Sequence, residues 1–185
     1  MPDPTDRERL RSRAAVDLVL SRPRTLGNGR LLCIDGPAGS GKTTFAGEVF
    51  EVYAGCRVVH MDDLYEGWSG LPRVGAQLGS LLGPLAEDRP GSYRRWDWHA
   101  DRWGETVVVD PVDLLVLEGV GSGSADPSLV TALVWVEAPE TVRLARGLER
   151  DGSVMEDHWR QWQRDEDEHF AEHRTRRRAD LVVTT

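Results

Sequence analysis

Lysine is nearly absent from this sequence, although basic residues are common. Lysine and arginine together number 23, and Lys42 is the only lysine. Isoleucine and asparagine also occur once each, as Ile34 and Asn28. Arginine has therefore taken almost every position at which either basic residue would serve. The position that keeps a lysine should need what arginine lacks, a compact ammonium group on a flexible stem.

Cysteine and long apolar runs are scarce as well. Cys33 and Cys56 lie in apolar, strand-like segments and are too few for a disulfide scaffold. We expect reduced core thiols, as in a cytoplasmic protein. No apolar run approaches the roughly 18 residues of a membrane helix. Residues 1–13 are charged and lack the apolar stretch of a signal peptide.

Positive charge is in deficit, with 31 acidic residues and a formal net charge of -8 at pH 7. A net-acidic surface disfavours broad binding to nucleic acids or anionic membranes, but it permits a local basic pocket for a small anion. The acidic run at 165–168 and the arginine run at 174–178 are expected to form a solvated helix face.

The 185 residues are enough for one domain in which short apolar strands alternate with helices. Strands are predicted at 30–35, 56–61, 113–117, 132–136 and 181–183, and segments 93–98 and 106–110 would pair as a hairpin. Helices are predicted at 5–20, 42–54, 72–87, 139–150 and 154–178. The first opens with a capping box of Thr5 and Glu8, and the third is interrupted at Pro84. This alternation indicates a parallel sheet covered on both faces.

Residues 36–43 (GPAGSGKT) fit the pattern G-x-x-x-x-G-K-[ST] between a predicted strand and a predicted helix. Glycines let successive backbone N–H groups point inward to form an anion nest, and the helix N-terminus adds partial positive charge. Lys42 would reach the β- and γ-phosphates of a nucleotide, and Thr43 would offer its hydroxyl to Mg²⁺. The only lysine of the chain thus lies where this loop needs one.

The phosphate loop alone does not separate GTPases, ATPase motors and kinases. The guanine signature N-K-x-D is absent, and it could not be present, because the only lysine already belongs to the phosphate loop. A motor is usually larger and has an apolar stretch that ends in aspartate. The third strand ends instead in Leu117-Glu118-Gly119.

Four motifs resemble those of the uridine kinase and phosphoribulokinase-like group of P-loop kinases. They are GPAGSGKTT at 36–44, MDDLY at 61–65, LEG at 117–119 and RLARGLERD at 143–151, and ADLVV at 179–183 resembles the closing strand of that group. The resemblance implies an α/β P-loop fold with a five-stranded parallel sheet in the order 2-3-1-4-5. Residues 30–185 would form the kinase domain, with a flap at about 66–110 and a lid at about 143–160. Residues 1–29 would be a helix and linker packed outside it.

The resemblance also implies roles for individual residues. Asp62 would be the base that accepts the proton of an acceptor hydroxyl, which fits a carboxylate at the carboxyl end of a strand beside the phosphate loop. Arg146 and Arg150, with Arg143, share one helix face and would stabilise the charge that develops on the transferred phosphoryl group. Metal binding would fall to Thr43, Glu118 and Asp63. ATP would be bound by Gly36, Pro37, Ala38, Gly39, Ser40, Gly41, Lys42, Thr43 and Thr44.

Aromatic residues gather where the acceptor is expected. Segment 93–103 contains three tryptophans, and Trp68 follows the base in the chain. Such side chains can stack on a flat acceptor or pack the core of a small flap, and the sequence leaves both open. The candidate acceptor-binding residues are Asp62, Tyr65, Tyr93, Trp96, Asp97 and Trp98.

The sequence therefore predicts an ATP- and Mg²⁺-dependent kinase for a small-molecule hydroxyl, with a pyrimidine nucleoside as the leading acceptor. A different small alcohol or a nucleoside monophosphate is the alternative among kinases. The rival from another class is a nucleotide-binding regulatory protein without acceptor chemistry. The expected partners are a nucleotide and a small acceptor, not nucleic acid or membrane.

Overall fold

The computed structural model describes residues 4–185, apart from the side chains of residues 4–8 and 153. The predicted capping box of Thr5 and Glu8 therefore lies outside the described side chains. The helices are α1 (Pro4–Ser21), α2 (Lys42–Val52), α3 (Gly75–Ala86), α4 (Glu140–Asp151), α5 (Glu156–His173) and α6 (Thr175–Arg178). The strands are β1 (Arg30–Asp35), β2 (Cys56–His60), β3 (Gly91–Asp97), β4 (Arg102–Val109), β5 (Leu114–Glu118), β6 (Ala132–Glu137) and β7 (Leu181–Thr184).

Within the described residues, five parallel strands form a sheet in the order β2-β5-β1-β6-β7. Strands β3 and β4 pair separately as an antiparallel hairpin. If only the strands of the main sheet are numbered along the chain, the order is 2-3-1-4-5, as the sequence predicts. The central β1 leads directly into the phosphate loop, and β5 lies beside it.

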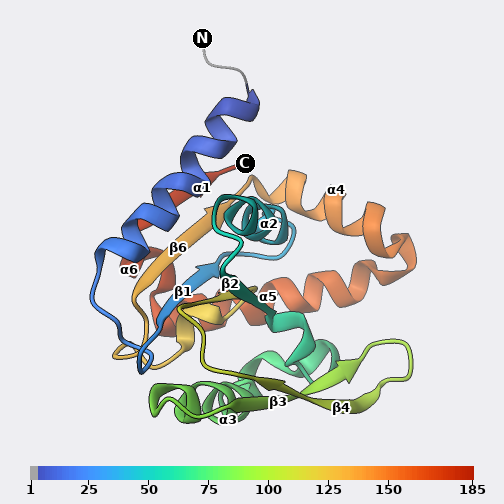
Figure 1. The fold of residues 1–185 in the computed structure, drawn as a ribbon. Helices are drawn as coiled ribbons and strands as arrows, with labels where there is room; N and C mark the ends of the chain where they lie inside the picture. Colours follow the sequence, from blue (N-terminus) through green and yellow to red (C-terminus); the bar gives the residue numbers. More distant parts are fainter. Residues whose placement is uncertain (1–3) are drawn as a thin grey trace.

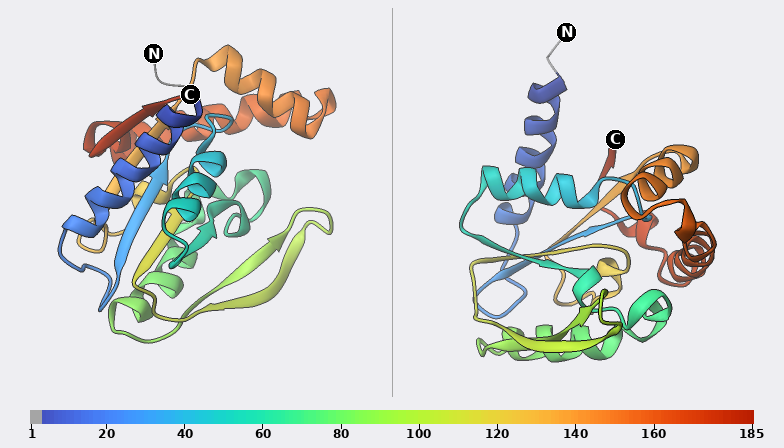
Figure 2. Two further views of the ribbon diagram at one scale, coloured as in Figure 1. Left: turned by 45° about the horizontal axis from the view of Figure 1, so that its top comes forward. Right: turned by 90° about the vertical axis from the view of Figure 1, so that its right-hand side faces the viewer.

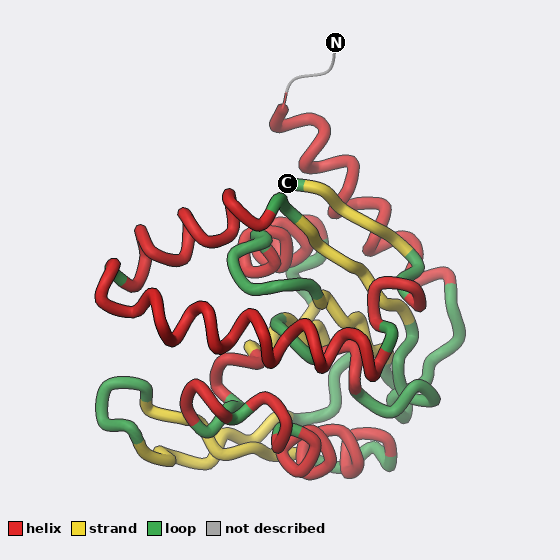
Figure 3. Tube along the Cα trace, turned by 180° about the vertical axis from the view of Figure 1, so that it is seen from behind, coloured by secondary structure: helices red, strands yellow, loops and turns green. Residues whose placement is uncertain are grey.

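Helices lie on both faces of the main sheet (Figure 1), and successive residues of β1 join different cores. On one face, Leu32 and Ile34 of β1 share a core with α1 and α2. On the other face, Leu31 and Cys33 share a core with α3, α5 and the β3-β4 hairpin. Helices α4 and α5 run back beside each other beyond the sheet (Figures 2 and 3). The two-faced parallel sheet expected from the sequence is therefore confirmed.

Several boundaries differ from the prediction for local reasons. The strand expected at 56–61 stops at His60, because Met61 begins a 3-10 turn. Pro84 lies inside α3 without ending it. The long polar helix predicted at 154–178 is divided at Arg174, whose backbone is left-handed with φ 51°.

Helix α1 was expected to pack outside the domain, but its inner face is part of the core. Ala15, Val16 and Val19 are each at most 3% exposed and join the same cluster as Phe45 of α2. Burial of this apolar stripe stabilises α1 on the sheet layer that carries the phosphate loop. Among the described residues, no helix is both long enough and apolar enough to span a membrane.

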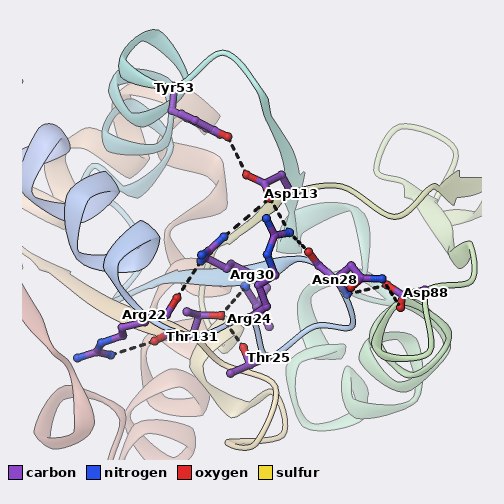
Figure 4. Close-up of polar contacts among 10 residues, drawn as sticks. Arg22, Arg24, Thr25, Asn28, Arg30, Tyr53, Asp88, Asp113 and Thr131 are labelled. Carbon is purple, nitrogen blue, oxygen red and sulfur yellow. Dashed lines mark hydrogen bonds and ion pairs between the residues drawn. The ribbon is translucent and has the colours of Figure 1, made fainter.

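The segment after α1 is held by a polar network at the amino ends of the strands (Figure 4). Arg22 donates to the carbonyl of Thr131, before β6, at 2.9 Å. Arg24 pairs with Asp113, before β5, at 2.7 Å, and Tyr53 donates to the same carboxylate at 2.9 Å. The start of this segment is thus tied to the residues that precede β5 and β6, at the end of the sheet opposite the phosphate loop.

Candidate active site

The phosphate loop joins β1 to α2 at the carboxyl edge of the sheet. A Cβ on Gly36 would lie 2.0 Å from the carbonyl oxygen of Val136, and one on Gly39 would lie 2.5 Å from that of Arg143. Both glycines also have positive φ, of 142° and 76°, so no other residue fits either position without displacing backbone. The spacing of glycines in the motif therefore reflects close packing against β6 and α4.

Lys42 begins α2 and its side chain spans the loop, donating to the carbonyl of Pro37 at 2.9 Å. The side chain is 7% exposed, and this burial lowers the pKa of its ammonium group. The negative charges of Glu166 and Asp35 oppose that effect. A buried cation aimed into a loop of backbone N–H groups is suited to a multiply charged anion.

Two buried carboxylates that the sequence interpretation missed brace this loop. Asp35 accepts the N–H groups of Gly36, Gly121 and Gly123 at 2.7, 2.9 and 2.8 Å, which ties the start of the loop to the turn after β5. Burial raises the pKa of Asp35 to about 6, although these three N–H donors oppose the shift.

Glu166 of α5 is the second of these carboxylates. It accepts the N–H of Ala38 at 2.8 Å and pairs with Arg143 of α4 at 3.0 Å, and it is fully buried. Burial raises its pKa to about 7. The prediction that 165–168 is a solvated face is therefore wrong at Glu166. That residue faces the phosphate loop because it shares a helix stripe with Trp159 and Trp162.

Thr43, Glu118 and His60 form a polar group at the ends of three elements. The Thr43 hydroxyl lies 3.2 Å from Glu118 Oε1, and His60 Nδ1 lies 2.5 Å from the same oxygen. The parallel register of β2 and β5 places His60 directly beside Glu118. The hydrogen bond to Glu118 raises the pKa of His60. A hydroxyl and a carboxylate are the oxygen donors that Mg²⁺ prefers, so these residues fit a magnesium ion shared with nucleotide phosphates.

The two aspartates after β2 face different surroundings. Asp62 is solvent-exposed within the cleft that it lines, and partial desolvation of its carboxyl group there raises its pKa. The charge of Glu118 raises it further, whereas Lys42 and Arg150 lower it. Asp63 faces the hairpin instead, with its carboxylate 3.5 Å from Arg95 and 3.4 Å from the Tyr93 hydroxyl. Asp63 does not line the cleft.

The arginines of α4 also divide by position. Arg146 lines the cleft and donates to the Gly39 carbonyl at 3.2 Å. Arg150 lines it as well, with a bidentate pair to Asp151 at 2.8 and 3.0 Å. Arg143 is instead held by Glu166 outside the cleft lining. The helix thus presents two arginines to the space between the phosphate loop and Asp62.

Aromatic side chains form the far end of the cleft. Trp68 packs edge-to-face against Trp98, Trp159 and Trp162, with ring centroids 5.7, 6.3 and 6.1 Å apart. Tyr65, which donates to the Val120 carbonyl, packs against Trp162 at 5.0 Å. All five rings line the cleft. Trp159 and Trp162 come from α5 and were missed by the sequence interpretation, although they are spaced three residues apart on one helix face.

Three of the predicted acceptor-binding residues lie elsewhere. Tyr93 and Trp96 are 4% and 8% exposed and pack within the hairpin and its core, and Trp96 contacts Trp103 edge-to-face at 5.0 Å. Asp97 accepts the N–H groups of His99 and Ala100 in the hairpin turn. For Tyr93 and Trp96 the structure favours packing of the flap over contact with an acceptor, whereas Asp97 is exposed and caps the hairpin turn.

One cleft of about 1090 Å³ collects most of the other predicted residues, but Gly36, Pro37 and Ser40 of the phosphate loop do not line it. From the phosphate loop it is lined by Ala38, Gly39, Gly41, Lys42, Thr43 and Thr44. Asp62, Tyr65, Trp98, Glu118, Arg146 and Arg150 complete the predicted residues that line it. The cleft is large enough for two small substrates side by side.

No protein-family model and no curated protein sequence matches the chain. Among solved structures, it is similar to a possible uridine kinase from Bacillus stearothermophilus, with 21% identity, a TM-score of 0.63 and coverage of 95% of this chain and 98% of that one. A protein assigned as a fructose transport system kinase from Silicibacter sp. TM1040 matches with 20% identity, a TM-score of 0.62 and coverage of 92% and 98%. A D-glycerate 3-kinase from Cryptococcus neoformans matches with 12% identity, a TM-score of 0.54 and coverage of 91% and 86%. The likeness shows that the chain has the fold of these P-loop kinase structures.

Proposed function

We propose that this protein is a kinase that transfers the γ-phosphoryl group of ATP to a hydroxyl group of a small molecule, most favourably a nucleoside. One observation carries the proposal. A single cleft brings the phosphate loop, the carboxylate of Asp62 and two arginines of α4 to face one another. The names of two similar structures, a possible uridine kinase and a D-glycerate 3-kinase, describe kinases for hydroxyl compounds and support the same reaction class.

The reaction follows from the positions of these groups. Asp62 accepts the proton of the acceptor hydroxyl as the oxygen attacks the γ-phosphorus, and the bond to the β–γ bridging oxygen breaks to release ADP. Lys42 and the loop N–H groups hold the leaving phosphates, while Arg146 and Arg150 stabilise the charge that develops during transfer. A magnesium ion held near Thr43 and Glu118 would neutralise phosphate charge.

The acceptor end of the cleft favours a neutral, flat compound. In the segment after β2, the carboxylate of Asp62 lines the cleft, whereas the first arginine, Arg73, pairs with Glu66 at 3.1 Å outside the cleft lining. Carboxylates repel an acceptor that already carries phosphate, so a nucleoside fits better than a nucleoside monophosphate. The tryptophans around Trp68 offer faces and edges on which a nucleobase can stack.

An acceptor panel with ATP and Mg²⁺ tests this proposal by product analysis. We expect monophosphate from at least one pyrimidine nucleoside and poorer reaction of nucleoside monophosphates. The Lys42→Arg variant is the control and should lose most of the activity, because a planar guanidinium does not fit the nest as an ammonium does. If diphosphate products form while every nucleoside stays unreacted, the acceptor is a nucleoside monophosphate and not a nucleoside.

If only a sugar or another small alcohol reacts, the kinase activity is supported, but the proposed stacking of a nucleobase on the tryptophans is contradicted. ATP binding without transfer to any acceptor would favour the rival class, a nucleotide-binding regulatory protein.

A further inference from the structure

The cleft continues past the phosphate loop on the side away from Asp62. The sheet order places β2, which leads to Asp62, at one edge and β7 at the other, with β1 and its phosphate loop between them. At the β7 end, the lining comes from three elements that are separate in sequence: Arg11 of α1, Thr44 and Glu48 of α2, and Thr184 and Thr185 at the end of β7. Figures 1 and 2 show α1 beside α2, with the end of β7 close to both.

Hydrogen bonds fix this end of the cleft to the phosphate loop. The Thr185 hydroxyl donates to the Ser40 carbonyl at 2.9 Å and accepts from Arg146 at 3.0 Å. Arg11 Nη1 donates to the carbonyl of Thr184 at 2.9 Å. The guanidinium of Arg11 is therefore held at the mouth of the cleft by the same strand end that packs against the loop.

The geometry of in-line phosphoryl transfer predicts which part of the donor nucleotide lies at the end of the cleft formed by α1 and β7. The attacking and leaving oxygens lie on opposite sides of the transferred phosphorus. If the acceptor hydroxyl lies at Asp62, then the α-phosphate and nucleoside of the donor extend from the loop away from Asp62, toward α1 and β7.

We propose that Arg11 binds the nucleoside part of the donor nucleotide, so that α1 forms a wall of the nucleotide site. The proposal rests on the proposed function. Arginine suits this place because its planar guanidinium can lie on the face of a nucleobase and also donate to its edge or to a ribose hydroxyl.

The experiment compares ADP with pyrophosphate, which present two linked phosphoryl groups with and without a nucleoside. Binding of each with Mg²⁺ is measured by titration calorimetry for the wild-type protein and for Arg11→Met, which keeps most of the aliphatic stem. Arg13→Met is the matched control, because Arg13 lies on the same helix, is 67% exposed and pairs with Asp17. Arg11→Lys serves as a second variant with the charge retained, and thermal unfolding of each variant reports whether α1 remains packed.

We expect Arg11→Met to weaken ADP binding by about fivefold while pyrophosphate binding and the Arg13→Met control stay unchanged. Arg11→Lys should recover little, because an ammonium lacks the planar face. Equal losses for ADP and pyrophosphate, or full recovery by Arg11→Lys, would show a phosphate contact and overturn the proposal. Unchanged ADP binding in Arg11→Met would also overturn it. If the wild-type protein binds neither compound, the proposed function itself fails.

Discussion

Asp62 and Asp63 are adjacent in sequence, yet the backbone turn after β2 sends them to different surroundings. Asp62 faces the cleft that holds Lys42 and Glu118, whereas Asp63 lies by Tyr93 and Arg95 of the hairpin. A carboxylate used as a base must be ionised. Because the pKa of Asp62 is raised, activity should begin to rise at higher pH than is usual for an aspartate.

We expect Asp62→Asn to lower kcat by about 100- to 10,000-fold while ADP binding is retained. Asp63→Asn, the matched control, should cost far less and should keep the acid limb of the pH–rate profile. Rates across pH and calorimetric titration with ADP check both. A greater loss in Asp63→Asn would mean that the base has been assigned to the wrong neighbour.

At the scale of elements, the packing of α4 on α5 depends on a glycine within α4. Gly147 is buried, and a Cβ at this position would lie 2.4 to 2.6 Å from the indole of Trp159, which is 1% exposed. The indole cannot move aside easily, because it is packed on all sides. The absence of a side chain at Gly147 therefore fixes how close α4 lies to the aromatic end of the cleft. Helix α4 carries Arg146 and Arg150.

Replacing two helical glycines by alanine should give opposite results. Gly79→Ala in α3 should stabilise the protein by up to about 1 kcal/mol, because alanine favours helix and its Cβ meets nothing within 4 Å. Gly147→Ala should lower the midpoint of thermal unfolding and reduce kcat, since α4 must shift away from Trp159. Thermal unfolding and steady-state rates measure both. Stabilisation by Gly147→Ala similar to that by Gly79→Ala would contradict the close packing.

At the scale of the whole molecule, the buried charge of Glu166 links stability to pH. Its pKa is near 4.5 in an unfolded chain and about 7 in the folded protein, so the folded state favours its protonated form. The stabilisation from this group is complete below pH 4.5 and is lost as the pH rises to about 7.

We therefore expect Glu166→Gln to gain in thermal midpoint relative to the wild-type protein as the pH rises from 4.5 to 7, measured without nucleotide. Glu168→Gln, on an exposed position of the same helix, is the control and should follow the wild-type protein. If the thermal midpoints of Glu166→Gln and the wild-type protein change in parallel with pH, then ionisation of Glu166 does not destabilise the folded state.

Local sequence patterns determined the phosphate loop, the parallel sheet and the hairpin of this protein. The spacing of Gly36, Gly41 and Lys42 specified the phosphate loop, because each residue type answers a backbone or charge requirement within a few residues. Apolar strand runs and turn residues indicated the parallel sheet, and the segments 93–98 and 106–110 indicated the hairpin seen as β3 and β4. The strand endings placed Glu118 beside the phosphate loop, since parallel strands end at one edge.

Only the tertiary structure decided which polar and aromatic side chains meet in the cleft. Glu166 and Ala38 are 128 residues apart, and Arg11 and Thr184 are 173 apart. No periodicity within a segment encodes such pairs. The charge of the 165–168 run favoured solvent exposure, but packing of the Trp159 and Trp162 stripe buried Glu166 with it. A charged residue locally favours exposure to solvent, but packing against distant segments can bury it where they supply hydrogen-bond donors. For Glu166 these donors are the Ala38 N–H and Arg143.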